Sequence, residues 1–461
     1  MERARALRTP VVTRIPAPRP LDDAWDVAQQ ALQKGVHATV WSDPDQDMLA
    51  VGVHSALQLT SEGETRLTTL DAKFQEIQTV SHPLLQDLPL WFGGFSFDHR
   101  SANDSVWHGW PPAELVTHAI TAITYQRKRY LVLSLVVSPE DDEAQLARAY
   151  DALQDQLRAL QETPATQPSP ALTFDEFDPS SLWHTQVARA QQAIDAGMLG
   201  KIVLARRVLA PWPTPTPTRQ ELAAYIAPAL AALRRRYQHC TTFAFLRAEK
   251  DIPTIFFGAT PELLVARKNA ILHTMALAGT ASRAEGFQAD EAQRQELLAS
   301  PKERQEHAFV VRDIQQNLEN IGIDVHVPSA PDVVTYPNVH HLRTTIRGKE
   351  PTDQGLLSIA AALHPTPAIC GTPTDTTYAW LHAHEGMDRG WYAGGVMWLN
   401  DAGDGRVNVA LRSAIASSAG VCAYAGAGIV EGSDAAQEWD ETRAKLAPIC
   451  QAFAPIAPAE R

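Results

Sequence analysis

Glutamates on the apolar faces of two predicted helices are the first side chains in this sequence whose placement suggests chemistry. The helix that begins near residue 300 has an apolar stripe formed by Val310, Ile314 and Leu318. At about 100° per residue, Glu303 projects within this stripe and Glu306 lies about 40° outside its edge. Glu303 can form a capping box with Ser300, whereas Glu306 has no capping role. A half-buried carboxylate without a cation is costly, so Glu306 calls for a positive charge nearby.

A second helix, close to the C-terminus, repeats this placement of acids. Its apolar positions step by three or four residues: Ala435, Trp439, Thr442, Leu446, Ile449 and Phe453. Ser433 is expected to cap this helix. Glu438, Glu441 and Lys445 form a second stripe, within roughly 60° of one another. Two interpretations stay open: a solvated rim with an i, i+4 Glu–Lys pair, or carboxylates from two distant helices that converge on Mg²⁺.

Composition restricts the class of protein. The 461 residues include 40 Lys and Arg against 53 Asp and Glu, and the net charge of -13 disfavours nucleic acid and acidic membranes as partners. The longest apolar stretch, Tyr130–Val137, is far shorter than the roughly 20 residues of a membrane helix. The N-terminus lacks an apolar signal region, and the four cysteines have no CxxC pairing. We therefore expect a cytoplasmic protein with no membrane or nucleic-acid partner.

The elements that must position the acids are strands and helices mixed along the chain. Apolar spacing predicts a helix over 143–161, and the proline-rich stretch 162–171 indicates a linker. Strand-like runs and an aromatic segment, WFGGFSFD, lie before this linker, while strands and helices alternate after it. The sequence thus predicts the α+β class, with a variable N-terminal portion over 1–170 and a catalytic region over 180–455.

Short segments of the second portion are recognisable as a set. They are GKIVLARR (200–207), FFGATPELL (256–264), ALAGT (276–280), SPKERQEH (300–307), VHHLRTTIRG (339–348), LHPTPAICGTP (363–373), GWYAGGV (390–396), ALRSA (410–414) and YAGAGIVEGSDAAQEWDETRAKL (424–446). In this order they resemble the chorismate-utilising enzyme family, and most closely its isochorismate synthases. The resemblance implies a single large chorismate-binding domain like that of anthranilate synthase component I, with extended antiparallel sheets in the core and helices outside.

The resemblance also implies roles for individual residues. Lys201 matches the general base that activates water, and Glu262 matches the general acid that protonates the departing C4 hydroxyl of chorismate. Four acids match a magnesium site, the first two as direct ligands and the others through the metal's waters: Glu306, Glu441, Glu303 and Glu438. The remaining matches line the substrate pocket: Gly279, Thr280, His341, Ala368, Tyr392, Arg412, Gly426 and Lys445.

The chemistry of chorismate makes sense of these residue types. Chorismate is a dianion, so Mg²⁺ between two glutamates, with Arg412 and Lys445 facing the carboxylates, would offset its charge. Exchange of a ring hydroxyl for water needs a base and an acid, and burial disfavours the charged form of a lysine. Without the resemblance, Lys201 would be interpreted as a surface charge at a strand end, Glu262 as an acid of a turn or helix start, and His341 as a packed histidine.

Three positions distinguish the branches of the family. Aminodeoxychorismate synthases resemble this chain but carry a lysine where it has Ala278, and anthranilate synthases lack the lysine found here as Lys201. Salicylate synthases, which go on to eliminate pyruvate, usually have a threonine where this chain has Ala368. We therefore expect isochorismate as the product, with salicylate synthase as the alternative. A catalytically dead homologue and an unrelated acidic structural protein are the remaining alternatives. We also expect a monomer, whose product could enter menaquinone or siderophore synthesis.

Overall fold

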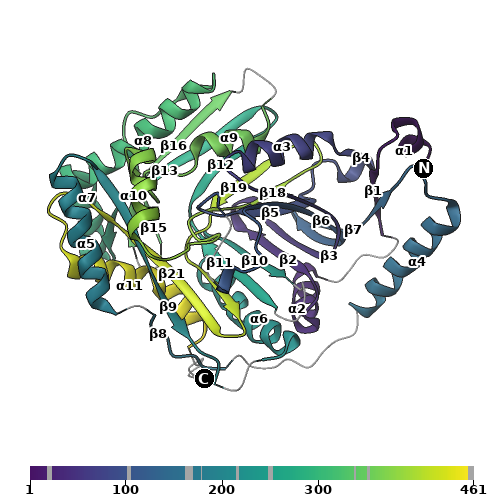
Figure 1. The fold of residues 1–461 in the computed structure, drawn as a ribbon, viewed down its shortest axis with the longest axis horizontal. Helices are drawn as coiled ribbons and strands as arrows, with labels where there is room; N and C mark the ends of the chain where they lie inside the picture. The colour runs from purple at the N-terminus through teal and green to yellow at the C-terminus, as the bar shows by residue number, and fades with distance from the viewer. Residues whose placement is uncertain are drawn as a thin grey trace.

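One hydrogen-bonded sheet forms the centre of the molecule, and helices pack around it (Figure 1). The computed structural model describes residues 1–17, 23–100, 105–160, 170–177, 179–213, 217–247, 253–336, 339–349 and 354–454. Among these residues every strand pair is antiparallel except β1–β4. The predicted α+β class, with an antiparallel core and helices outside, is confirmed.

The strands and helices alternate irregularly along the chain. The strands are β1 Val11–Pro16, β2 Ala38–Asp43, β3 Met48–Ser61, β4 Gln78–Ser81, β5 Trp91–Phe95, β6 Ala113–Tyr125, β7 Lys128–Val137, β8 Asp175–Glu176, β9 Lys201–Ala210, β10 Thr241–Arg247, β11 Thr254–Thr260, β12 Leu263–Lys268, β13 Ile271–Ser282, β14 Asp324–His326, β15 Asp332–Thr335, β16 Val339–Lys349, β17 Gly371–Thr372, β18 Gly395–Leu399, β19 Gly405–Val409, β20 Ser413–Ser417 and β21 Gly420–Ile429. The helices are α1 Glu2–Leu7, α2 Ala24–Lys34, α3 Arg66–Glu76, α4 Glu143–Ala159, α5 Ser180–Asp195, α6 Arg219–Arg236, α7 Phe287–Ala299, α8 Pro301–Asn320, α9 Leu356–Leu363, α10 Thr374–His384 and α11 Ala435–Ala452.

Two long branches of the sheet lead from β6, beside the short row formed by β7, β1 and β4. One branch runs through β3, β2, β10, β11, β20 and β21 to β9. The other runs through β5, β18, β19, β12 and β13 to β16. The chain crosses between the branches at Pro261–Glu262, which joins β11 to β12, and again at 410–412, which joins β19 to β20. Residues at these crossings therefore lie where the two branches meet.

Strands of the N-terminal portion are built into both branches. β2 pairs with β10, and β5, which carries the aromatic segment WFGGF, pairs with β18. The portion 1–170 thus shares the sheet of the catalytic region, while its variability stays a prediction. Of the predicted linker over 162–171, residues 162–169 lie outside the described part of the chain.

Helix boundaries agree with the sequence patterns, but two caps differ. α4 ends at Ala159, close to the predicted end, and begins with a capping box of Asp142 and Gln145. At α8, Ser300 accepts from the Glu303 amide as predicted, but the Glu303 side chain bonds elsewhere, so the capping box is incomplete. The predicted cap of α11 by Ser433 is wrong.

Asp434 caps α11, because its Oδ1 accepts from the amides of Ala436 and Gln437. The Ser433 hydroxyl instead donates to Glu438 Oε1 at 3.0 Å. The Ser433 hydroxyl therefore hydrogen-bonds to the Glu438 side chain and does not cap the first turn of α11.

Two apolar clusters fix the helices on the sheet. One joins α3, α5, α8, α9 and α10 to the sheet, and the other joins α2, α4, α6 and α11. α8 presents Val310, Ile314 and Leu318 to the first cluster, and α11 presents Leu446 and Ile449 to the second. In the described residues no helix combines the length and apolar character that crossing a membrane requires.

Candidate active site

One pocket, with a volume of about 130 Å³, is lined by all the predicted site residues except Tyr392. It lies between β9 and β21 of one branch, β13 and β16 of the other, and the helices α8 and α11. The members are Lys201, Glu262, Gly279, Thr280, Glu303, Glu306, His341, Ala368, Arg412, Gly426, Glu438, Glu441 and Lys445. Tyr392 lies in an adjoining cavity of about 60 Å³, which is also lined by Ala368, Arg412, Gly426 and Lys445.

Lys201 is buried at the start of β9 and is not a surface charge. Its side chain is 4% exposed, and Nζ donates to Glu306 Oε1 at 2.5 Å. Gly428 on the neighbouring strand β21 leaves room for this lysine, because a Cβ there would come within 2.9 Å of Lys201 Cε. The pair therefore joins a strand of the sheet to the acidic face of α8.

Glu262 is an enclosed carboxyl at the first crossing between the branches. Its backbone oxygen accepts from the Val409 amide at 3.0 Å and from Asn408 Nδ2 at 3.2 Å. Burial raises the pKa of the Glu262 carboxyl to about 7, against the opposing effect of three cations: Arg412, Lys445 and Lys201. Near neutral pH this carboxyl can hold a proton and release it, as a general acid must.

The acids of the two helices face the same pocket. Glu303 Oε2 accepts from the Thr280 amide at 2.9 Å, and burial, together with Glu306, raises the Glu303 pKa. On α11, burial and the neighbouring Glu441 raise the pKa of Glu438 to about 7. Burial would also raise the pKa of Glu441, but Lys445, at 2.5 Å, more than offsets this and the pKa is lowered.

This set of acids fits a hard divalent cation in its donor type. Carboxylate oxygens from two helices are the ligands that Mg²⁺ takes. A bound cation would offset the burial and the mutual repulsion that raise the pKa values of Glu303 and Glu438. Among the described residues, however, no group of three acids, histidines or cysteines converges as a ready metal site. The predicted direct ligands, Glu306 and Glu441, each form an ion pair with a lysine instead.

Cations and a neutral histidine line the rest of the pocket. Arg412, at the second crossing, has a φ of 49°, and its guanidinium has no hydrogen-bond or ion-pair partner among the described residues. Lys445 Nζ donates to the Gly426 oxygen at 2.9 Å. Burial, with Arg412 and Lys445, lowers the pKa of His341 to about 3. Arg412 is thus a half-buried cation that is free to bind an anion.

The bulge in β13 beside the pocket depends on glycine. Gly279 has a φ of 81° and lies where the β13–β16 register shifts. This bend directs the Thr280 amide toward Glu303, and Thr280 Oγ1 lies 3.0 Å from His341 Nδ1. Sequence reasoning did not single out Val203, Lys302 or Gly428 as pocket residues. Their positions inside the recognised segments were the available signal, since Val203 and Gly428 alternate with pocket residues along β9 and β21.

Comparisons with known proteins show the family to which this chain is similar. Residues 1–454 match the profile of a family described as chorismate binding enzyme. The chain is 32% identical over 440 residues to the salicylate biosynthesis isochorismate synthase of Pseudomonas aeruginosa. The aligned region covers 94% of this chain and 87% of that protein. Its structure is similar to the menaquinone-specific isochorismate synthase from Escherichia coli, with a TM-score of 0.80, 26% identity and coverage of 97% and 96%. It shares the fold of anthranilate synthase component I from Streptococcus pneumoniae, with a TM-score of 0.70, 21% identity and coverage of 88% and 92%.

Proposed function

The chain belongs to the chorismate-binding enzyme family, and from this premise we propose that it is an isochorismate synthase, which isomerises chorismate to isochorismate. The observation that carries the proposal is that Lys201 and Glu262 face one pocket that also contains Arg412 and Lys445. These are the base, the acid and the two cations that water addition to a dianionic ring requires.

The reaction adds water at C2 and expels the C4 hydroxyl. Lys201 Nζ takes a proton from the attacking water, the ring double bond shifts, and the Glu262 carboxyl gives its proton to the departing oxygen, so that one water enters and one leaves. Lys201 Nζ must leave its bond to Glu306 Oε1 to reach the attacking water. Arg412 and Lys445 hold the carboxylates of the substrate.

Magnesium is part of this proposal. Glu306 and Glu441 would hold the ion directly, with Glu303 and Glu438 on its waters. Bound Mg²⁺ would neutralise one substrate carboxylate within a pocket that already contains five acids. The positive charges of Mg²⁺, Arg412 and Lys445 would thus allow a protein of negative net charge to bind a dianion.

Product analysis tests the proposal. Purified protein, chorismate and Mg²⁺ are incubated, and the products are separated by chromatography. We expect isochorismate, formed reversibly. Anthranilate formed from added ammonia, or no turnover, would contradict the proposal, and salicylate with pyruvate in place of isochorismate would identify the chain as the alternative, a salicylate synthase.

A further inference from the structure

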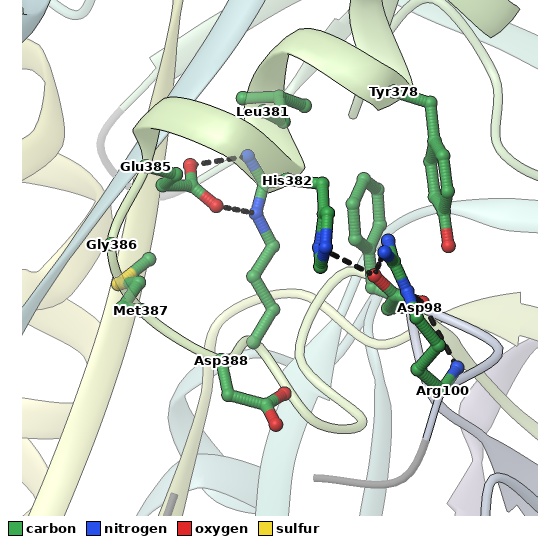
Figure 2. A pocket seen from close by; sticks show the side chains of 11 residues that line it. Asp98, Arg100, Tyr378, Leu381, His382, Glu385, Gly386, Met387 and Asp388 are labelled. Atoms are coloured by element: carbon green, nitrogen blue, oxygen red, sulfur yellow. Dashed lines mark hydrogen bonds and ion pairs between the residues drawn. The ribbon is translucent and has the colours of Figure 1, made fainter. Parts of the chain in front are cut away.

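A buried ion pair joins Glu385 and Arg389 behind the wall of the substrate pocket. Arg389 Nε donates to Glu385 Oε2 at 2.7 Å and Nη2 to Oε1 at 2.6 Å, with side chains only 2% and 4% exposed. Figure 2 shows Glu385, with both bonds, at the edge of a separate cavity of about 400 Å³ just after α10. Arg389 also lines the small cavity beside the substrate pocket. The pair therefore stands between two cavities.

The same two side chains complete the hydrogen bonding of β9. On one edge β9 pairs continuously with β21, but on the other only its ends are paired, with β17 at Lys201 and Ile202 and with β8 at Val208 and Leu209. Beyond β17, the Val203 oxygen accepts from Arg389 Nη2 at 2.7 Å, and the Ala205 amide donates to Glu385 Oε1 at 2.9 Å. The ion pair thus takes the place of a missing strand.

A further bond ties the pair to the loop that precedes β17. Arg389 Nη1 donates to the Ile369 oxygen at 2.9 Å, and Ile369 follows Ala368, which lines the substrate pocket. Lys201 and Val203 alternate along β9 and also line that pocket. The backbone that one guanidinium holds is therefore the backbone that carries the proposed base and the residue that distinguishes the product branch.

We propose that the Glu385–Arg389 pair is a positioning unit for the reaction, which fixes Lys201 and Ala368 relative to the substrate ring. This inference rests on the proposed function. Loss of the guanidinium of Arg389 would leave the Val203 and Ile369 oxygens without a donor. The 366–370 loop would then be held to β9 only by the Val203 amide, which donates to the Cys370 oxygen at 2.7 Å, and by the β17 pairs. Misplacement of a reacting group by about 1 Å costs about 100-fold in rate.

A matched control separates positioning from stability. Arg14 is also a buried arginine with a two-point bond, through Nε and Nη2, to Asp401, at 2.9 and 2.8 Å. It also donates to Thr117 and Ser134, and neither Arg14 nor Asp401 lines the substrate pocket. Arg14→Lys should therefore lower the melting temperature without a change in chemistry.

The experiment compares Arg389→Lys with Arg14→Lys and the wild type. We expect kcat of Arg389→Lys to fall about 10- to 100-fold, with a smaller change in KM and a larger fraction of turnovers that release pyruvate. Amide hydrogen exchange should quicken in peptides from β9 and 366–371 in Arg389→Lys, but not in Arg14→Lys. If Arg389→Lys does not fold, Glu385→Gln, which keeps an acceptor for the Ala205 amide, should show the same changes to a smaller degree.

Wild-type kcat, product ratio and exchange in a folded Arg389→Lys, or in Glu385→Gln if that protein replaces it, would overturn the inference and leave the pair with a role in stability alone. Failure of the proposed function is a different result, because the wild type would then not convert chorismate. The exchange comparison needs no substrate and would still report whether the pair holds β9.

Discussion

Lys201 and Glu262 have different electrostatic surroundings, as a base and an acid of one reaction require. Lys201 donates to the Glu306 carboxylate, whereas Glu262 is buried near cations with no hydrogen bond to its side chain among the described residues. The burial that raises the pKa of Glu262 thus suits this carboxyl to the role of the acid, and Lys201 lies in the same pocket. The sequence identified both only through the family resemblance, because lysine at a strand start and glutamate after proline are common at protein surfaces.

The Lys201→Ala variant should bind chorismate but lose water addition. Removal of the base should lower kcat by about 10²- to 10⁴-fold, because general base assistance has that magnitude. Calorimetric titration with chorismate and a turnover assay measure the two effects separately. Near-normal turnover with an unchanged pH–rate profile would show that Lys201 is a structural charge.

The state of Glu262 should limit activity at high pH. Its pKa of about 7 means that the proton needed for the leaving hydroxyl is present below this pH, so kcat should fall as the pH rises through about 7. The raised pKa also means that Glu262 stabilises the fold at low pH, and that this contribution is lost as the pH rises through the folded-state value. Glu262→Gln should remove this limb of the profile along with most of the activity, and an unchanged limb in that variant would assign it to another group.

Strand β21 leaves space for the Lys201 side chain because it has a glycine at position 428. A methyl group at Gly428 would come within 2.9 Å of Lys201 Cε and 3.4 Å of Glu306 Oε1. Gly428→Ala should therefore displace the lysine and lower kcat by about tenfold or more. Gly200→Ala is the control, because a Cβ there meets Thr372 only at an ordinary contact distance of 3.4 Å. Equal steady-state rates in the two variants would mean that Lys201 tolerates the displacement.

Helices α8 and α11 should be linked by magnesium. If their acids bind the ion, MgCl₂ should raise the melting temperature of the wild type, since tenfold excess over Kd contributes about 1.4 kcal/mol. Glu306→Gln and Glu441→Gln should lose this shift, whereas Glu303→Gln and Glu438→Gln should lose less of it. A wild-type magnesium response in the first two variants would remove those acids from the proposed metal site.

Helices could be predicted because their apolar pattern involves residues close together in the sequence. Hydrogen bonds between residues far apart in the sequence could not be predicted. Apolar spacing gave the range of α4 and the acidic faces of α8 and α11, because these depend on neighbours within two turns. The bond of Glu303 to the Thr280 amide depends on a bulge in another strand, and the cap of α11 depended on a choice between adjacent Ser433 and Asp434. Such choices are decided by tertiary contacts that no local pattern contains.

The two branches of the sheet meet at the pocket, and this arrangement explains why its residues are scattered along the chain. Glu262 and Arg412 lie on the two crossings, while β9 and β13 bring in Lys201 and Thr280 from opposite branches. The N-terminal portion shares the sheet through β2 and β5, so the pocket depends on the fold of the whole chain. The expected monomer stays a prediction.

Isotope transfer from solvent tests whether this pocket adds water to chorismate. The wild-type protein is incubated briefly with chorismate and Mg²⁺ in H₂¹⁸O, and the isochorismate formed is analysed by mass spectrometry. We predict that each product molecule formed in the first turnovers carries one ¹⁸O atom, in the new C2 hydroxyl, and that Lys201→Ala forms almost none. Isochorismate without the label, or no isochorismate from the wild type, would contradict water addition by Lys201 and Glu262.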